Sequence, residues 1–164
     1  MIIRSYQDKD LFVIKEITAL CFDGVCIDQN IQNLVGEIDN KSWQWRKVRH
    51  IDADVATNAS GVFVAEVDKR VVGYITTRID PESKVGGIPN IAVLPAAQGE
   101  GIGRALMERA ILYFQEVGMH YTRIETLDQN DIGSDFYPNM GFKEVARQIH
   151  YVMSIPDPDG DGKG

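Results

Sequence analysis

Three glycines stand at alternate positions near the middle of the chain: Gly99, Gly101 and Gly103. They follow an apolar stretch at residues 91–94 and open a stretch, residues 101–117, whose apolar residues recur at helical spacing. The first turn of a helix leaves backbone N–H groups without partners and adds partial positive charge. Glycines let an anion approach the backbone closely. The pattern therefore predicts a phosphate-binding turn between a strand and a helix.

Two common nucleotide motifs do not fit this turn. The P-loop pattern G-x-x-x-x-G-K-[ST] does not occur in the sequence. The dinucleotide pattern G-x-G-x-x-G requires its third glycine one position later than Gly103, and no βαβ repeat precedes the run. A nucleotide fold of either kind is therefore a poor interpretation.

The run does match the pattern Q-x-x-G-x-G, and a second motif follows about thirty residues later. That motif is an Asn, a Tyr seven residues on, and then Gly-Phe. With both motifs the sequence resembles the GNAT family of acyl-CoA-dependent N-acetyltransferases. The opening of the chain (Arg4 with Asp10 six residues on) and its close (residues 151–153) are also similar to that family, so the resemblance covers residues 1–155. The motif residues are Gln98, Gly101, Gly103, Asn130, Tyr137, Gly141 and Phe142.

The resemblance implies an α/β (α+β) fold with a central mixed, mostly antiparallel sheet flanked by helices and splayed between its two central strands. It implies one N-acetyltransferase domain over residues 1–155. Its activity would be direct transfer of an acetyl group, within a ternary complex, from acetyl-CoA as cosubstrate to a primary amine of a small molecule or peptide. A catalytically silent acyl-CoA-binding sensor is the alternative. The resemblance also raises a homodimer as a partner state.

The resemblance carries specific roles for the backbone around the turn. The N–H groups of the turn would bind the pyrophosphate of coenzyme A, Arg104 would add a charged contact, and Gln98 would brace the loop or touch phosphate. The preceding strand would pair with the pantetheine arm like an added strand, with the Val93 N–H donating to the thioester carbonyl. The cofactor-binding residues expected on this basis are Ile91, Ala92, Val93, Gln98, Gly99, Glu100, Gly101, Ile102, Gly103, Arg104, Asn130 and Tyr137.

Tyr137 is the expected general acid, because a phenol can hand a proton to a departing thiolate. Asn130 would contact the pantetheine arm or cap the short helix that carries the tyrosine. Val93 and Tyr137 are therefore the expected catalytic pair.

The general base is left open by the sequence. Many relatives carry a Glu in the strand that leads to Val93, whereas the matching neighbourhood here contains Asn90, which cannot accept a proton. Glu125, Asp128 or a water relay could replace it. The three histidines, His50, His120 and His150, lack motif support.

Secondary-structure patterns place these residues on alternating elements. The expected strands are residues 2–4, a hairpin of 62–67 with 71–79, then 88–94, 122–127, and a final pair at 142–147 and 149–155. The expected helices are residues 8–20, further helices within 21–60, 101–117 and a short one at 132–137. Pro81 and the pair Gly86-Gly87 are expected to form a turn.

Residues 21–60 are expected to shape the acceptor pocket, and they carry a basic and aromatic cluster. Such a cluster would suit an anionic or aromatic acceptor. We favour the plainer interpretation, an amphipathic helix whose tryptophans pack inward and whose charges face water. The cluster consists of Trp43, Trp45, Arg46, Lys47, Arg49 and His50.

Composition restricts the remaining possibilities. The chain has 164 residues with 44% hydrophobic residues, which suits one domain. The net charge of −7 argues against nucleic acid or an anionic membrane as the partner, and favours a cationic amine. No stretch approaches the roughly 18 apolar residues of a membrane span, and the polar first residues lead us to expect no secretory signal. Together with two cysteines expected to be reduced, Cys21 and Cys26, this suggests a cytoplasmic setting.

The last residues, 156–164, are expected to form a flexible acidic tail. They imitate the start of a calcium loop, but the Glu that would complete the ligand set would lie beyond the last residue. No metal site is therefore expected.

Overall fold

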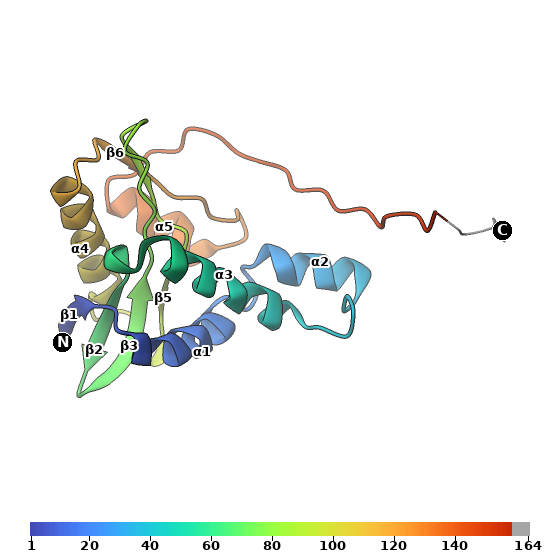
Figure 1. Cartoon of the computed structure of the whole chain (residues 1–164), viewed down its shortest axis with the longest axis horizontal. Helices are drawn as coiled ribbons and strands as arrows, with labels where there is room; N and C mark the ends of the chain where they lie inside the picture. The colour runs from blue at the N-terminus through green and yellow to red at the C-terminus, as the bar shows by residue number, and fades with distance from the viewer. Residues whose placement is uncertain (159–164) are drawn as a thin grey trace.

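An antiparallel sheet divides the helices into two layers (Figure 1). The computed structural model describes residues 1–158. The sheet has the order β1-β2-β3-β5, and a second, two-stranded sheet pairs β4 with β6. The strands are β1 (Ile2–Ser5), β2 (Phe63–Val67), β3 (Arg70–Ile75), β4 (Val85–Gly87), β5 (Ile91–Val93) and β6 (Tyr121–Arg123). The helices are α1 (Leu11–Cys21), α2 (Ile27–Val35), α3 (Trp43–Asn58), α4 (Ile102–Glu116) and α5 (Asp131–Asn139), with short 3₁₀ turns at Asp8–Asp10, Ala59–Gly61 and Pro95–Ala97.

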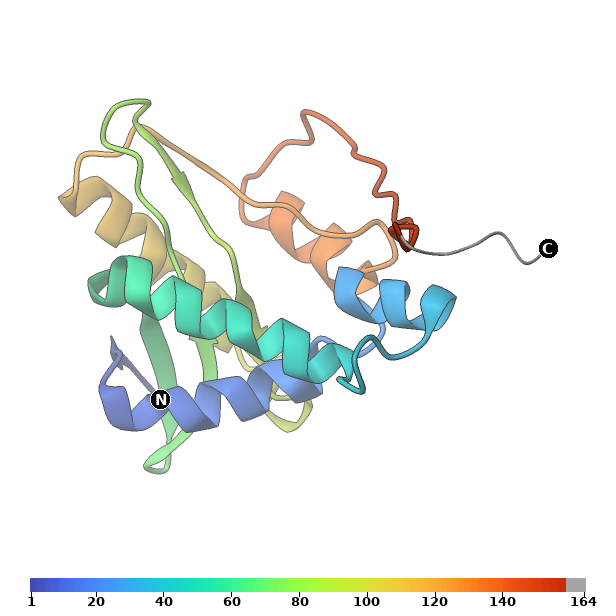
Figure 2. The same cartoon turned by 45° about the vertical axis from the view of Figure 1, so that its right-hand side comes forward.

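The two-residue alternation of the strands supplies both layers of the core. On one face of the main sheet, Val64, Tyr74 and Ala92 pack against α1 and α3, which run alongside each other across this face (Figure 2). On the other face, Phe63 and Ile75 pack against α4. Because β2 and β3 are covered on both faces, they read in the sequence as continuous apolar runs.

The small parallel sheet marks the place where two neighbouring strands separate. β4 and β6 pair from Val85 with Tyr121 to Gly87 with Arg123, and the Ile88 N–H continues the ladder to the Arg123 carbonyl at 3.1 Å. Within residues 1–158, no backbone hydrogen bond joins β5 to residues 124–127. The expected splay between the central strands therefore lies beside β5.

Gly86 and Gly87 form part of β4 and not the turn that the sequence predicted. The reason is packing, because a side chain at Gly86 would collide with the Phe114 ring of α4. A glycine inside a strand often marks such a close approach and not a chain reversal.

The expected final strands, residues 142–147 and 149–155, are absent from the described part of the chain. Residues 143–155 are extended but bond to no backbone group of residues 1–158, and a strand is defined by its ladder. β6 is likewise shorter than the expected 122–127. Of the acidic tail, residues 159–164 lie outside the described residues. Among residues 1–158, no helix combines the length and apolar composition that crossing a membrane requires.

Candidate active site

The glycine turn adopts a conformation that side chains rarely tolerate. Gly99 has a φ of +83° and Gly101, the N-cap of α4, has a φ of +77°. Both lie in the left-handed region that favours glycine. A Cβ built on either residue would meet no atom within 4 Å, so the space above the turn is open.

The amide groups of this turn are unpaired. The first bond of α4 runs from the Ala105 N–H to the Gly101 carbonyl at 3.0 Å. Within the described chain, the N–H groups of residues 99–101 have no backbone partner, and those of residues 102–104 belong to the first helical turn. Gln98 donates from Nε2 to the Val93 carbonyl at 3.0 Å, so it braces the loop against β5. Arg104 is exposed and lies 3.8 Å from Glu108.

The register of β5 directs alternate backbone groups away from β3. The Leu94 N–H bonds to the Val72 carbonyl at 2.8 Å, and the Thr76 N–H bonds to the Asn90 carbonyl at 2.8 Å. In an antiparallel ladder this pattern turns the N–H and C=O groups of Ile91 and Val93 away from β3, toward the splay. On that side the Val93 carbonyl accepts from Gln98 and, at 3.5 Å, from the Cys21 thiol.

Tyr137 lies on α5, which packs beside the start of α4. A Cβ on Gly103 would lie 3.5 Å from the Phe136 ring, and the Tyr137 ring stands edge-on to Phe136 at 5.5 Å and to Phe142 at 6.0 Å. Tyr137 contacts the same apolar cluster as Ile91 and Val93. The structure thus gathers the turn, the free edge of β5 and the tyrosine around one cluster.

Asn130 acts as the N-cap of α5. Its Oδ1 accepts from the Gly133 N–H at 3.1 Å, and its Nδ2 donates to Thr126 Oγ1 at 2.9 Å. Gly133 is required here, because a side chain would press on both Asn130 and the Tyr137 ring. We expected Asn130 either to contact the pantetheine arm or to cap the short helix, and these contacts show the cap.

The Tyr137 hydroxyl has no hydrogen-bond partner among residues 1–158. Burial raises the pKa of the phenol to about 12, so the hydroxyl stays protonated at neutral pH. Burial also raises the pKa of the Cys21 thiol to about 11, which keeps this sulfur a thiol and a weak nucleophile.

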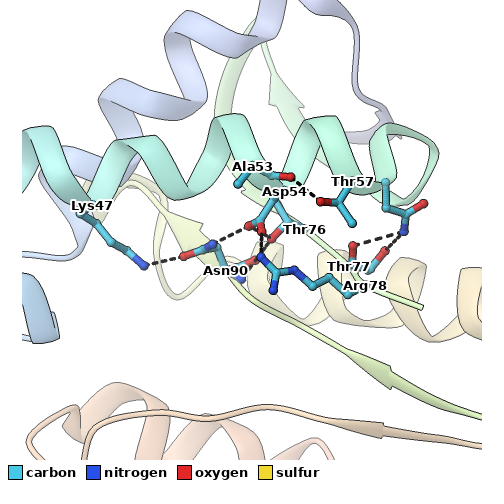
Figure 3. A network of polar contacts seen from close by, with 9 residues as sticks. Lys47, Ala53, Asp54, Thr57, Thr76, Thr77, Arg78 and Asn90 are labelled. Carbon is cyan, nitrogen blue, oxygen red and sulfur yellow. Dashed lines mark hydrogen bonds and ion pairs between the residues drawn. The ribbon is translucent and has the colours of Figure 1, made fainter. Parts of the chain in front are cut away.

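A buried polar network joins α3 to the strands that it covers, β3 and β5 (Figure 3). Asp54 of α3, fully buried, accepts from Asn90 Nδ2 at 2.6 Å, from Thr76 Oγ1 at 2.8 Å and from the Arg78 guanidinium at 2.9 Å. Asn90 Oδ1 in turn accepts from Lys47 Nζ at 2.7 Å. Three donors satisfy the buried carboxylate, as a charge removed from water requires.

Lys47 overturns the expectation that the charges of α3 face water. It is 8% exposed, and its Nζ lies 4.0 Å from the centre of the Phe22 ring. Burial lowers its pKa, with Asp54 and Asp28 acting in the opposite direction. Because a single lysine in a polar helix carries no sequence signal of burial, only its spacing of seven from Asp54 could have suggested a shared face.

The tryptophans of α3 also divide. Trp43 packs inward and is 4% exposed, as expected, whereas Trp45 is 41% exposed. Lys41, Arg46 and Arg49 surround the Trp45 ring at 4.6 to 5.9 Å from its centre. Trp45, Arg49 and His50 of this cluster are thus exposed, whereas Trp43 and Lys47 are buried. Lys47 is the member of the cluster that reaches the network.

The remaining candidate bases lie at the surface. Glu125 is exposed and lies 3.5 Å from Arg123, and Asp128 is exposed. His50 Nε2 lies 3.8 Å from Asp28, and burial lowers the pKa of this imidazole below its usual 6.5. Asn90 itself donates to one partner and accepts from another, so its amide has a purely positioning part in the network.

Known proteins share both the sequence pattern and the fold. Residues 28–142 match the model of the Acetyltransferase (GNAT) family. The chain belongs to the GNAT family of acetyltransferases. The match spans both motifs up to Phe142, and it confirms the family that the sequence motifs indicated.

Curated relatives of this GNAT protein include acetyltransferases whose names differ in the acceptor that they specify. A mycothiol acetyltransferase of Thermomonospora curvata is 26% identical over 115 residues, which are 70% of this chain and 38% of the relative. An N-alpha-acetyltransferase of Sulfurisphaera tokodaii is 36% identical over 106 residues, 58% of this chain and 64% of the relative. The chain thus spans less than two thirds of the length of either relative.

Solved structures confirm the fold class. PaiA N-acetyltransferase from Thermoplasma acidophilum, in complex with coenzyme A, aligns with a TM-score of 0.69 at 20% identity, covering 87% of this chain and 89% of the other. Ard1 from Thermoplasma volcanium aligns with a TM-score of 0.66 at 23% identity, covering 88% and 84%. The α+β architecture with mixed sheets between helices is therefore that of GNAT proteins.

Proposed function

We propose that this protein transfers the acetyl group of acetyl-CoA to a primary amine of a small molecule or peptide, within a ternary complex. The observation that supports this most is that hydrogen-bond donors without partners follow one another from β5 through the glycine turn, with the Tyr137 hydroxyl on the neighbouring helix α5. The free edge of β5 leads into a glycine turn whose amides have no partners, beside a tyrosine hydroxyl that is also unpaired. Residues 1–155 would act as one domain.

The unpaired amides of the turn suit the pyrophosphate of the cosubstrate. Six N–H groups lie in this turn, from Gly99 to Arg104, and the space above Gly99 and Gly101 holds no other atom within 4 Å of a Cβ built there. The partial positive charge of the α4 N-terminus adds to them, and the exposed Arg104 guanidinium can reach toward a phosphate. Glu100 and Ile102 contribute through their backbone alone.

The edge of β5 suits the pantetheine arm and the thioester. Ile91 and Val93 would pair with the amides of the arm as a strand would, with Ala92 bonded to β3 on the other side. The Val93 N–H would donate to the thioester oxygen, where negative charge develops when the amine attacks. Asn130 would support this wall through its cap on α5.

Tyr137 would assist departure of the sulfur. The amine nitrogen forms a bond to the acetyl carbon, the carbon–sulfur bond breaks, and the sulfur takes a hydrogen from the phenol. The amine must attack in its neutral form, and the proton that it loses would leave through water, since the Asn90 amide cannot accept one. The phenol then regains a proton from solvent.

A silent acyl-CoA sensor is the second candidate, and Asn90 at the position of the usual Glu favours it. One experiment separates the two. Acetyl-CoA is titrated calorimetrically, and thiol release is then measured over a panel of polyamines, amino acids, peptides with free α-amino groups and aminoglycosides. Binding with amine-dependent release supports the enzyme, binding without any release supports the sensor, and no binding overturns both.

A further inference from the structure

One glutamine joins two segments that are far apart in the sequence. Gln129 Nε2 donates to the Gly24 carbonyl at 2.7 Å and to Asn30 Oδ1 at 3.2 Å, and Gln129 Oε1 accepts from Asn30 Nδ2 at 2.8 Å. In the part of the chain that the structure describes, no other hydrogen bond or ion pair connects residues 22–42 with residues 120–142. We call these three hydrogen bonds the Gln129 bridge.

The Gln129 bridge spans the splay beside β5. On one side, α1 ends at Cys21, whose thiol contacts the Val93 carbonyl at 3.5 Å, and Gly24 follows three residues later. On the other side, the splay separates β5 from residues 124–127, and Gln129 follows two residues after them. Figure 2 shows α2 beside the start of α5, where the bridge joins them. The bridge thus lies over the backbone that would hold the thioester.

The bridge also lies where an acceptor would enter, an argument that rests on the proposed function. Coenzyme A would occupy the side of the glycine turn, which begins α4 on one face of the main sheet. The amine would then approach the thioester from the side of α1, which packs on the other face. Because the bridge closes that side to hydrogen-bond distance, an amine has to pass beneath it or displace it.

The bridge has the properties of a contact that opens at low cost. Gln129, Asn30 and Gly24 are all exposed, and water readily replaces hydrogen bonds between exposed neutral groups. No residue of α2 is fully buried, so its movement would expose little apolar surface. Gly24 and Gly36 precede and follow α2 with φ angles of +79° and +81°, and such positions can serve as hinges.

We propose that the Gln129 bridge selects the acceptor, admitting slender amines beneath it and excluding bulky ones while it is closed. Gln129 would be a specificity-determining residue that acts without touching the acetyl group. Because Asn130, the cap of α5, directly follows Gln129, the closed bridge would also hold the helix that carries Tyr137. Acceptor choice and the placement of the phenol would therefore be linked.

Modification of the Cys21 thiol measures access beneath the bridge and needs no transfer activity. Cys26→Ser leaves Cys21 as the single cysteine, and serine suits the N-cap position of α2 that Cys26 occupies. Mass spectrometry follows the reaction with small methyl methanethiosulfonate and with a bulky fluorescein maleimide. In this background Gln129→Ala should accelerate the bulky reagent at least about fivefold and the small one less than about twofold. Gln44→Ala, at an exposed glutamine without a side-chain hydrogen bond in the described chain, should change neither rate.

Two further variants separate the hydrogen bonds from the bulk of the side chain. Gln129→Glu keeps the size but cannot donate to the Gly24 carbonyl, so it should behave like Gln129→Ala. Asn30→Ala should also accelerate the bulky reagent, and combining it with Gln129→Ala should add nothing, because both remove one bridge. Wild-type rates in Gln129→Ala, equal acceleration of both reagents, or additive effects would each overturn the proposal. Far-ultraviolet circular dichroism verifies that the variants keep their helices.

Thiol release with a linear polyamine and with an aminoglycoside tests the selection itself. In Gln129→Ala the ratio of kcat/KM for the aminoglycoside to that for the polyamine should rise at least about fivefold, with an unchanged KM for acetyl-CoA. An unchanged ratio would overturn selection by the bridge. If no amine gives release in any variant, the proposed function fails, and the Cys21 rates still decide whether the bridge controls access.

Discussion

Lys47 Nζ lies 2.7 Å from Asn90 Oδ1, and this contact joins α3 to the residue immediately before β5. Asn90 also donates from Nδ2 to Asp54, and these two contacts fix the orientation of the Asn90 side chain. The resemblance to the GNAT family led us to expect a Glu at this position, whose carboxylate would accept a proton. In this chain the same place holds an amide that positions a buried lysine.

The first prediction concerns the titration of Lys47. Because its pKa is lowered in the native protein, the unfolded chain binds more protons between that value and the usual 10.5. The free energy of unfolding of the wild type, minus that of Lys47→Met, should therefore rise with pH through this window. Urea unfolding of both proteins from neutral pH to about pH 10 measures the difference. A difference that falls with pH would contradict the lowered pKa.

Asp54→Asn should strongly destabilise the protein. The substitution removes a fully buried carboxylate that accepts from Arg78, Asn90 and Thr76, and it leaves these donors partly unpaired. The expected loss is about 3–5 kcal/mol, as for breaking a buried charge network. Asp52→Asn, on the same helix, removes only an exposed pair with Lys15 and should cost less than about 1 kcal/mol. Equal losses in chemical unfolding would contradict the network.

Gly101→Leu and Gly118→Leu form a matched pair for the phosphate turn. Both glycines have a φ of +77° and open space around a Cβ, but they lie at opposite ends of α4. Each variant should lose about 1–2 kcal/mol of stability from the left-handed backbone. Only Gly101→Leu should weaken acetyl-CoA binding, by at least about tenfold in calorimetry, because its side chain fills the space above the amides. Equal affinities would place the pyrophosphate elsewhere.

Tyr137→Phe should lower kcat by roughly 10²-fold while leaving the affinity for acetyl-CoA nearly unchanged. The pKa of about 12 means that the phenol stays protonated between about pH 6 and 10, so the loss should be the same throughout this range. Steady-state thiol release at several pH values measures it. Tyr121→Phe, at an exposed position of β6, is the control and should leave kcat unchanged. Unchanged turnover in Tyr137→Phe would remove the tyrosine from the chemistry.

Patterns of neighbouring residues were sufficient to predict the structural features that depend only on those residues. The spacing of Gln98, Gly101 and Gly103 predicted a strand-to-helix turn, and Asn130 with Tyr137 predicted a capped short helix; both are present. The turn depends on the positive φ that glycine permits, and the helix start depends on a capping residue within three positions. Both can therefore be predicted from a short stretch of sequence. The GNAT motifs belong to this class, and with them came the family and the fold.

Tertiary structure alone decided the features that depend on distant partners. Lys47 is buried because Phe22 and Asn90 meet it there, and Gly86 lies in a strand because Phe114 packs on it. Residues 143–155 have the alternation of a strand but pair with no backbone group of residues 1–158, because a ladder needs a second set of backbone groups that this stretch cannot supply for itself. The sequence determined which residues could form a strand or carry a charge, and the partners available in space determined which of them did.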